Sequence, residues 1–199
     1  MKKIMFNTKY GLEQAVLSGT KTMTRRLVPC NACNSVLPAM HYQGLESYYE
    51  FVIKNHAHYD VGEEVAVAQS YHALNKAGFV APEWLDNTCE ASAGYENKMF
   101  VRADLMPHRI RITDIKIERL QDISNEDCLR EGIIKRDDLI NSNMESIVRY
   151  WFEGSFEYRV WKSYATPREA FARLIDKVSG NGTWNNNPFV FVYSFELIC

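Results

Sequence analysis

Long hydrophobic runs are missing from this chain, and cysteine is scarce. No apolar run approaches the roughly 20 residues that cross a bilayer, and the opening segment MKKIMFNTKY lacks the apolar core of a secretion signal. The five cysteines are an odd number without regular spacing, which favours reduced thiols over a disulfide framework. These absences predict a cytoplasmic protein with no membrane partner.

Neither sign of charge dominates. The formal net charge is −2, which excludes a protein that coats polyanions without specificity. The basic residues are nevertheless uneven, because residues 19–29 carry three basic and no acidic side chains, and residues 98–119 carry six basic against three acidic. Two local basic surfaces on an acidic body suit a specific anionic or nucleotide ligand. Ordinary solvated strand faces are an equally good explanation.

Several familiar site motifs are also missing. The sequence contains no GxGxxG, P-loop, HExxH, GxSxG or HxE pattern. Cys30 and Cys33 have the spacing of half a zinc knuckle, which His41, His56 or His58 could complete. A single CxxC with histidines at arbitrary distances is more often incidental, so we expect neither a metal nor another cofactor.

The hydrophobic patterns predict about six strands and two or three core helices. Strands are expected at residues 4–6, 21–26, 64–70, 98–102, 109–120 and 189–198, and helices at residues 8–19, 124–131 and 166–180. A phase shift across Thr113-Asp114 indicates a bulge in the longest strand. Because strands and helices do not alternate regularly, an α+β domain on a mixed or antiparallel sheet or small β-barrel is favoured over a Rossmann-like fold.

Three irregular stretches interrupt what we interpret as a single domain of residues 1–199. They cover approximately residues 30–60, 71–97 and 133–165. The third stretch predicts one further helix near residues 144–152 and holds an aromatic cluster that either is buried or stacks on bases. The cluster consists of Tyr150, Trp151, Phe152, Phe156, Tyr158 and Trp161.

Residues 19–26 combine hydroxyls, an amine and two guanidiniums. Gly19 is placed to end the first helix in the left-handed conformation, and the residues after it favour a strand. On a regular strand Lys21 and Thr24, three positions apart, face opposite sides. A site that uses both therefore requires a bend between them. The alternative is that Lys21, Arg25 and Arg26 form surface salt bridges while the threonines only favour the strand.

The helix over residues 124–131 has strong boundary signals. Ser124 suits the N-cap, Asp127 the third position, and Gly132 the stop. Glu131 in the last turn opposes the helix dipole. This placement indicates either a functional carboxylate or a solvated side chain, for which the cost is only about a few tenths of a kcal/mol.

Together these residues resemble the ASCH domain, a family with a PUA-like β-barrel fold whose relatives bind RNA. Three features carry the resemblance: the run Gly19-x-Lys21-x-x-Thr24-x-Arg26 after a helix, Val61-Gly62-Glu63 before a strand, and a later helix that ends in Glu131-Gly132. The family signature is GxKxxExR, and Thr24 replaces its glutamate here. The small ASCH-domain amidohydrolases that deacetylate N4-acetylcytidine have the same replacement. The chain is also similar to ASCH-domain proteins of phages and prophages over residues 99–133 and 167–195.

The resemblance to the amidohydrolases implies a catalytic set in which Lys21 is the base, Thr24 the nucleophile and Glu131 the proton donor. A lysine base requires a pKa near 7–8. Burial and the neighbouring Arg25 and Arg26 would lower the Lys21 pKa, whereas Glu131 would raise it unless its carboxyl is protonated. A neutral Lys21 amine and a protonated Glu131 carboxyl are both favoured in a desolvated pocket, whereas an open pocket favours their charged forms.

Further ligand contacts complete the prediction. Arg26 can hold a pyrimidine carbonyl or sugar oxygen, and the other ligand-binding candidates are Arg25, Gln69, Arg102 and Arg111. Two functions stay open. The chain is an amidohydrolase of an acylated nucleoside, or it is a non-catalytic module that binds RNA or a modified base through its basic and aromatic residues.

Overall fold

The computed structural model describes residues 1–29, 45–79, 92–140, 145–154, 156–157 and 160–198. Its centre is a five-stranded mixed sheet in the order β1-β3-β4-β9-β2. The strands are β1 (Lys3–Ile4), β2 (Met23–Leu27), β3 (Glu64–Val67), β4 (Arg109–Arg119) and β9 (Phe189–Leu197). β1 pairs with β3 in parallel, and the other neighbours are antiparallel. The protein is thus α+β with a mixed sheet, as predicted.

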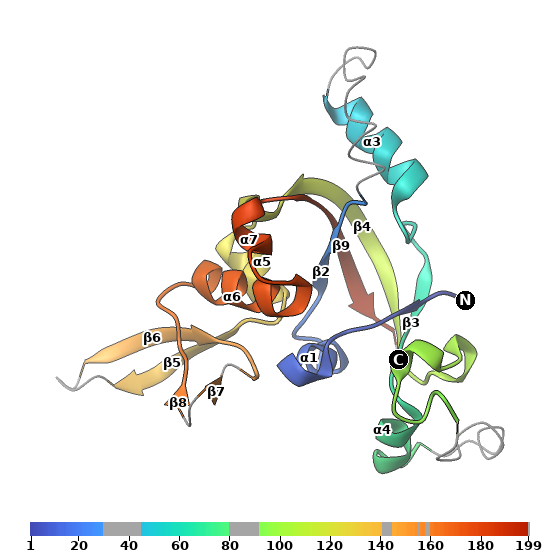
Figure 1. The fold of residues 1–199 in the computed structure, drawn as a ribbon, viewed down its shortest axis with the longest axis horizontal. Helices are drawn as coiled ribbons and strands as arrows, with labels where there is room; N and C mark the ends of the chain where they lie inside the picture. The colour runs from blue at the N-terminus through green and yellow to red at the C-terminus, as the bar shows by residue number, and fades with distance from the viewer. Residues whose placement is uncertain (30–44, 80–91, 141–144, 155, 158–159, 199) are drawn as a thin grey trace.

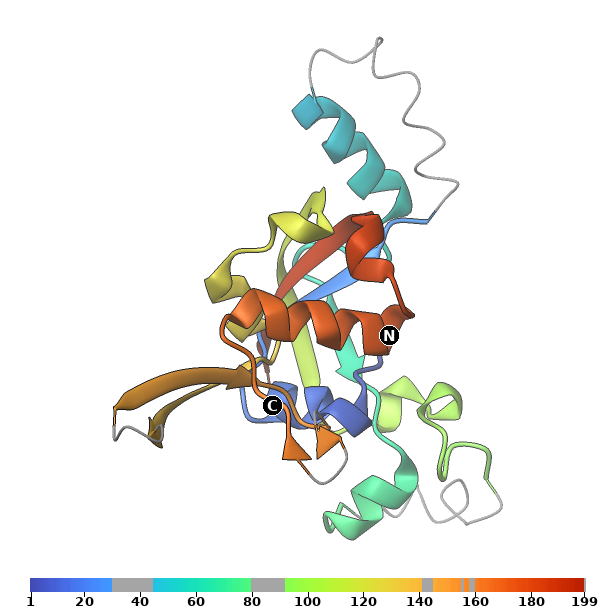
Figure 2. The same cartoon turned by 60° about the vertical axis from the view of Figure 1, so that its left-hand side comes forward.

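Helices pack around this sheet, and short 3-10 turns join the elements. The helices of the described residues are α1 (Leu12–Leu17), α3 (Leu45–His56), α4 (Tyr71–Lys76), α5 (Asn125–Arg130), α6 (Pro167–Ser179) and α7 (Thr183–Asn186). The 3-10 turns are η1 (Thr8–Tyr10), η4 (Lys98–Phe100), η5 (Ala103–Leu105) and η6 (Leu120–Asp122). Figures 1 and 2 show α6 crossing one side of the sheet, with α5 and α7 beside it.

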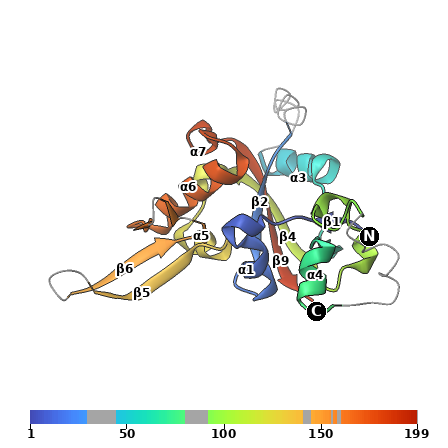
Figure 3. The same cartoon turned by 60° about the horizontal axis from the view of Figure 1, so that its bottom comes forward.

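Two hairpins lie outside the main sheet. They pair β5 (Ile134–Ile140) with β6 (Ser146–Trp151), and β7 (Phe156–Glu157) with β8 (Val160–Trp161). The β5–β6 hairpin projects away from the sheet beyond α6, and Figure 3 shows α1 between this hairpin and the sheet. No described helix combines the length and the apolarity needed to cross a membrane.

The core forms where β9 lies between β4 and β2. Both faces of β9 are covered, so that consecutive residues from Val190 to Tyr193 are all buried. On one side the core continues into α6 through Ala170, Phe171 and Leu174. This packing places the start of β2 beneath α6, next to the end of α5.

Several predicted signals are confirmed. The register of β4 against β9 shifts between Ile112 and Asp114, where the bulge was expected. The Ser124 side chain accepts a hydrogen bond from the Asp127 N–H at 3.0 Å, and Thr166 caps α6 in the same way. Gly19 has the left-handed φ of 72°.

Other predictions were wrong. Residues 98–102 are not a strand, because Asn97 accepts a hydrogen bond from the Met99 N–H at 2.9 Å and starts a 3-10 turn. The helix expected near residues 144–152 is wrong too, since residues 146–151 form β6 and pair with β5. The first helix is divided at Gly11, whose φ is 66°. Stretches expected to be irregular contain α3 and α4.

Candidate active site

The segment between α1 and β2 is hydrogen-bonded to both neighbouring helices before the strand begins. The Lys21 N–H donates to Ala15 O at 2.8 Å, and the Thr22 N–H donates to Arg130 O at 3.0 Å. These two bonds tie the segment to α1 and to α5, so that β2 starts only at Met23. Lys21 therefore precedes the strand, and the alternation of strand faces does not separate it from Thr24. Lys21 and Thr24 line the same pocket, since the regular strand begins only after Lys21.

The end of α5 brings Glu131 to the same place. Glu131 is the C-cap residue of this helix, and Gly132 follows with a φ of 102°. A Cβ at Gly132 would lie 3.2 Å from Leu12 Cδ2 and 3.7 Å from Lys21 Cδ. The positive φ favours glycine here, and a larger residue would also require Leu12 to shift by a few tenths of an ångström. Gly132 lets the end of α5 pack closely against α1 and Lys21.

Lys21 and Glu131 form a buried ion pair. The Lys21 Nζ donates to Glu131 Oε2 at 2.6 Å, to the Glu131 backbone oxygen at 2.8 Å and to Met23 O at 2.7 Å. Lys21 is only 2% exposed and Glu131 only 5%. All three protons of the ammonium therefore have acceptors. The interpretation of Glu131 as a solvated side chain is wrong.

Arg25 holds the other side of the same carboxylate. Its Nη1 donates to Glu131 Oε1 at 3.0 Å, and its Nη2 donates to Glu118 Oε1 at 2.6 Å and to Asp127 Oδ2 at 3.2 Å. Lys21 and Arg25 thus form buried ion pairs and not the surface salt bridges of the alternative interpretation. Buried ion pairs add little net stability compared with apolar replacements. A network of this kind is therefore consistent with a functional role.

Burial also changes the acidity of Lys21. Removal from water lowers the pKa of the Lys21 amine from its usual 10.5, while the Glu131 carboxylate opposes the change and the nearby Arg26 and Arg25 reinforce it. The environment accordingly favours a neutral amine more than water does. This is the direction that a lysine base requires.

A pocket of about 360 Å³ opens onto this cluster, and we call it the Thr24 pocket. Lys21, Thr24, Arg25, Arg26 and Glu131 line one part of it. The apolar wall is formed by Met5, Phe6, Leu12, Leu27, Phe171, Leu174, Ile175 and Val178. Its volume lies in the range of pockets that bind small molecules, about 300–1,000 Å³.

Thr24 is positioned by β2 and is only 5% exposed. In the part of the chain that the structure describes, its hydroxyl makes no hydrogen bond, whereas the Thr22 hydroxyl accepts one from Arg130 Nε at 3.2 Å. Thr24 and Lys21 share the pocket without a direct hydrogen bond between Oγ1 and Nζ. The Thr24 hydroxyl is thus available to a ligand.

Three of the predicted ligand-binding residues lie elsewhere. The Gln69 side chain is buried with Oε1 at 2.7 Å from His108 Nδ1. Arg102 is exposed and pairs with Asp104, and Arg111 on β4 pairs with Glu64 and Glu196. None of the three lines the Thr24 pocket. Any ligand role they have belongs to another surface.

Sequence reasoning missed part of the site. Glu118 on β4 and Asp127 on α5 both bind Arg25, and Phe171 on α6 supplies the wall, with its ring centroid 6.0 Å from the Arg25 guanidinium carbon. The buried stripe of α6 is evident from its spacing, but nothing local shows that part of it faces a pocket. The ion pairs of Arg25 have no local signal either, because they join residues 93 and 102 positions apart.

The half zinc knuckle stays untested, because Cys30, Cys33 and His41 lie outside the described residues. Within the described ranges, no group of three or more His, Cys, Asp or Glu side chains is arranged to hold a metal ion.

Comparison of the chain with family models, curated proteins and solved structures found no match. The interpretation of the site therefore depends on its geometry and on the sequence motif.

Proposed function

We propose that this protein is an amidohydrolase that removes the acyl group from an acylated nucleoside or base such as N4-acetylcytidine. One observation carries the proposal. The buried Lys21–Glu131 pair, with 2.6 Å between Nζ and Oε2, shares a pocket with the Thr24 hydroxyl, which no described residue binds. A threonine nucleophile needs a base, and an amine leaving group needs an acid.

The reaction begins with a proton transfer inside the pair. Movement of one proton across the 2.6 Å contact converts the ammonium and carboxylate into a neutral amine and a carboxylic acid. The Lys21 amine then takes the Thr24 proton as Oγ1 attacks the acyl carbon. The tetrahedral intermediate breaks its C–N bond, and the Glu131 acid protonates the departing amino group. This leaves an acyl-threonine ester beside an ammonium and a carboxylate.

The second half returns the site to its starting state. The Glu131 carboxylate takes a proton from a water molecule, whose oxygen attacks the ester. As the ester bond breaks, the Lys21 ammonium returns its proton to Thr24 Oγ1, and the carboxylic acid product leaves. Transfer of the proton from the Glu131 acid back to the Lys21 amine across the same contact then restores the ion pair. Arg25 keeps Glu131 in place throughout, since it holds the other carboxylate oxygen at 3.0 Å.

The shape of the sheet supports a PUA-like barrel as the framework. β1 and β2 are the two edges of the sheet. The Arg26 Nη2 on β2 donates to Met5 O, directly after β1, at 2.7 Å. A side chain thus bridges the two edges, as expected of a sheet that curls toward closure.

Release of cytidine and acetate from N4-acetylcytidine tests the proposal. We expect turnover by the purified protein, loss of turnover in Thr24→Ala and partial activity in Thr24→Ser, followed by chromatography. Thr22→Ala is the matched control, because Thr22 lies in the same segment but outside the pocket. Absence of turnover across a panel of acylated nucleosides and bases would overturn the assignment.

The alternative is a non-catalytic module that binds RNA or a modified base. One observation favours it. Arg136 and Arg149 lie opposite each other in the β5–β6 register and line a pocket of about 350 Å³ together with Trp151 and Lys162. Cations beside an aromatic ring suit single-stranded nucleic acid. This function predicts salt-dependent RNA binding that Arg149→Ala weakens, and absence of binding at low salt would exclude it.

A further inference from the structure

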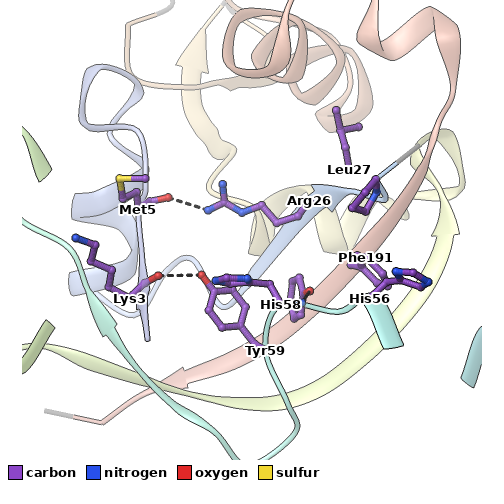
Figure 4. A pocket seen from close by; sticks show the side chains of 10 residues that line it. Lys3, Met5, Arg26, Leu27, His56, His58, Tyr59 and Phe191 are labelled. Carbon is purple, nitrogen blue, oxygen red and sulfur yellow. Dashed lines mark hydrogen bonds between the residues drawn. The ribbon is translucent and has the colours of Figure 1, made fainter. Parts of the chain in front are cut away.

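A second pocket, of about 320 Å³, adjoins the Thr24 pocket, and we call it the His58 pocket (Figure 4). Met5, Arg26 and Leu27 line both pockets. The Arg26 side chain therefore contacts both spaces. A ligand held in the Thr24 pocket can extend past Arg26 into the His58 pocket.

The polar groups of the His58 pocket are suited to an anion. Arg26, His56 and His58 line it, and no aspartate or glutamate does so among the described residues. The Arg26 Nη2 donates to Met5 O at 2.7 Å, and within the described ranges the guanidinium has no ion pair. The two imidazoles make no hydrogen bond to any described residue. Permanent positive charge and available N–H donors thus meet in one cavity.

The one further cation of the lining is directed elsewhere. Lys3 Nζ donates to Met99 O at 2.7 Å and to Val101 O at 2.6 Å. Figure 4 shows its side chain extending away from Tyr59 and Arg26. The ammonium adds positive charge near the pocket, but its hydrogen bonds are already used. Arg26 and the two histidines remain as the contacts available to a ligand.

Aromatic rings form the apolar part of the pocket. The rings of Tyr59 and Tyr193 pack edge to face at 5.3 Å, and Phe191 lies 6.1 Å from Tyr193. The Tyr59 hydroxyl donates to Lys3 O at 3.1 Å, and the Tyr193 hydroxyl accepts from the His58 N–H at 3.0 Å. Burial raises the pKa of Tyr59 to about 12, so this phenol stays neutral. The rings present a rigid, uncharged surface beside the basic groups.

We propose that the substrate of the Thr24 pocket is a nucleotide, whose phosphate binds Arg26, His56 and His58 in the His58 pocket. The proposal rests on the proposed function, because it assigns the acylated base to the Thr24 pocket. A planar guanidinium and imidazole N–H groups are well matched to phosphate oxygens. No described carboxylate lines the pocket, and the Glu63 carboxylate, which lies close enough to His58 to interact with it, is paired with Lys2 Nζ at 3.0 Å.

Steady-state kinetics with matched substrates test this proposal. The probes are N4-acetylcytidine and its 5′- and 3′-monophosphates. We expect at least one monophosphate to have a kcat/KM about tenfold or more above that of the nucleoside, as a gain from charge-assisted hydrogen bonds. The double substitution His56→Ala and His58→Ala should bring this ratio close to one. His72→Ala is the control and should keep the ratio, because His72 is exposed and pairs with Glu96 outside the pocket.

The outcomes separate this proposal from the proposed function. Equal kcat/KM values for nucleoside and both monophosphates would overturn the nucleotide proposal and leave the amidohydrolase standing. If no substrate is turned over, the amidohydrolase assignment is wrong. Calorimetry with cytidine and its 5′- and 3′-monophosphates then tests the nucleotide proposal by itself. Tighter binding of a monophosphate, lost in the double variant but kept in His72→Ala, would support it. Equal binding would overturn it. Circular dichroism checks that the variants are folded.

Discussion

Lys21 Nζ and Glu131 Oε2 lie 2.6 Å apart, although 110 positions separate the two residues along the chain. The contact brings the segment before β2 against the end of α5, beside Thr24 of β2, which lines the pocket. Arg25 binds the second oxygen of the same carboxylate. The pair is thus both a buried electrostatic contact and the centre of the proposed chemistry.

The two members of the pair should differ in their effect on stability. Glu131→Gln leaves the buried Lys21 ammonium without a carboxylate, which we expect to reduce the free energy of unfolding by about 3–5 kcal/mol. Lys21→Met should cost less, because Glu131 keeps its bond to Arg25. Urea unfolding at neutral pH measures both values. A larger loss in Lys21→Met would contradict this account of the network.

The pH dependence of activity should report Lys21. The active pair holds one proton between Lys21 and Glu131, so kcat/KM should fall at high pH, where the Lys21 ammonium loses that proton to solvent and no acid remains for the leaving group. Burial lowers the pKa of Lys21 from its usual 10.5, so the midpoint of this limb of the pH profile should lie below pH 10.5. Arg26→Gln removes a positive neighbour that lowers the Lys21 pKa, so the limb should move to higher pH. Profiles of kcat/KM against pH for the two proteins test this. An unchanged midpoint would show that a group other than Lys21 titrates in this limb.

Gly132 should tolerate substitution less well than another glycine with a positive φ. Gly132 has a φ of 102° and Gly62 a φ of 84°, so alanine at either position should cost about 1–2 kcal/mol of unfolding free energy in backbone strain. Only at Gly132 does the added Cβ meet neighbours, with Leu12 Cδ2 at 3.2 Å. Gly132→Ala should therefore be the less stable variant in thermal unfolding. It should also lose more activity, since it displaces Glu131. Equal stability would show that Leu12 moves aside without cost.

Cys128 should be unreactive while the protein is folded. Burial raises the pKa of its thiol to about 12, which leaves almost no thiolate near neutral pH. Alkylation followed by peptide mass spectrometry should show no modification of Cys128 in native protein and full modification in urea. Rapid labelling under native conditions would indicate that α5 opens readily.

Local sequence signals accounted for much of the secondary structure. The Ser124 and Thr166 caps marked the starts of α5 and α6, and the phase shift in β4 marked its bulge. Each of these features depends on residues within a few positions of one another. The motif that includes Lys21 and Thr24 was likewise visible without coordinates. The helix predicted near residues 144–152 was wrong, because pairing with β5 outweighs the local helical pattern and makes this segment the strand β6.

Packing between distant segments decided how the site is built. Whether Glu131 was solvated or buried depended on what covers the end of α5, and the covering comes from α1 and Lys21. The partners of Arg25 come from β4 and α5, and the pocket wall comes from α6. No local pattern encodes these contacts, because the energy of a buried charge depends on the surrounding dielectric and on partners supplied by the whole fold. The chain thus carried the candidate residues in its motif, and the tertiary structure determined which of them meet.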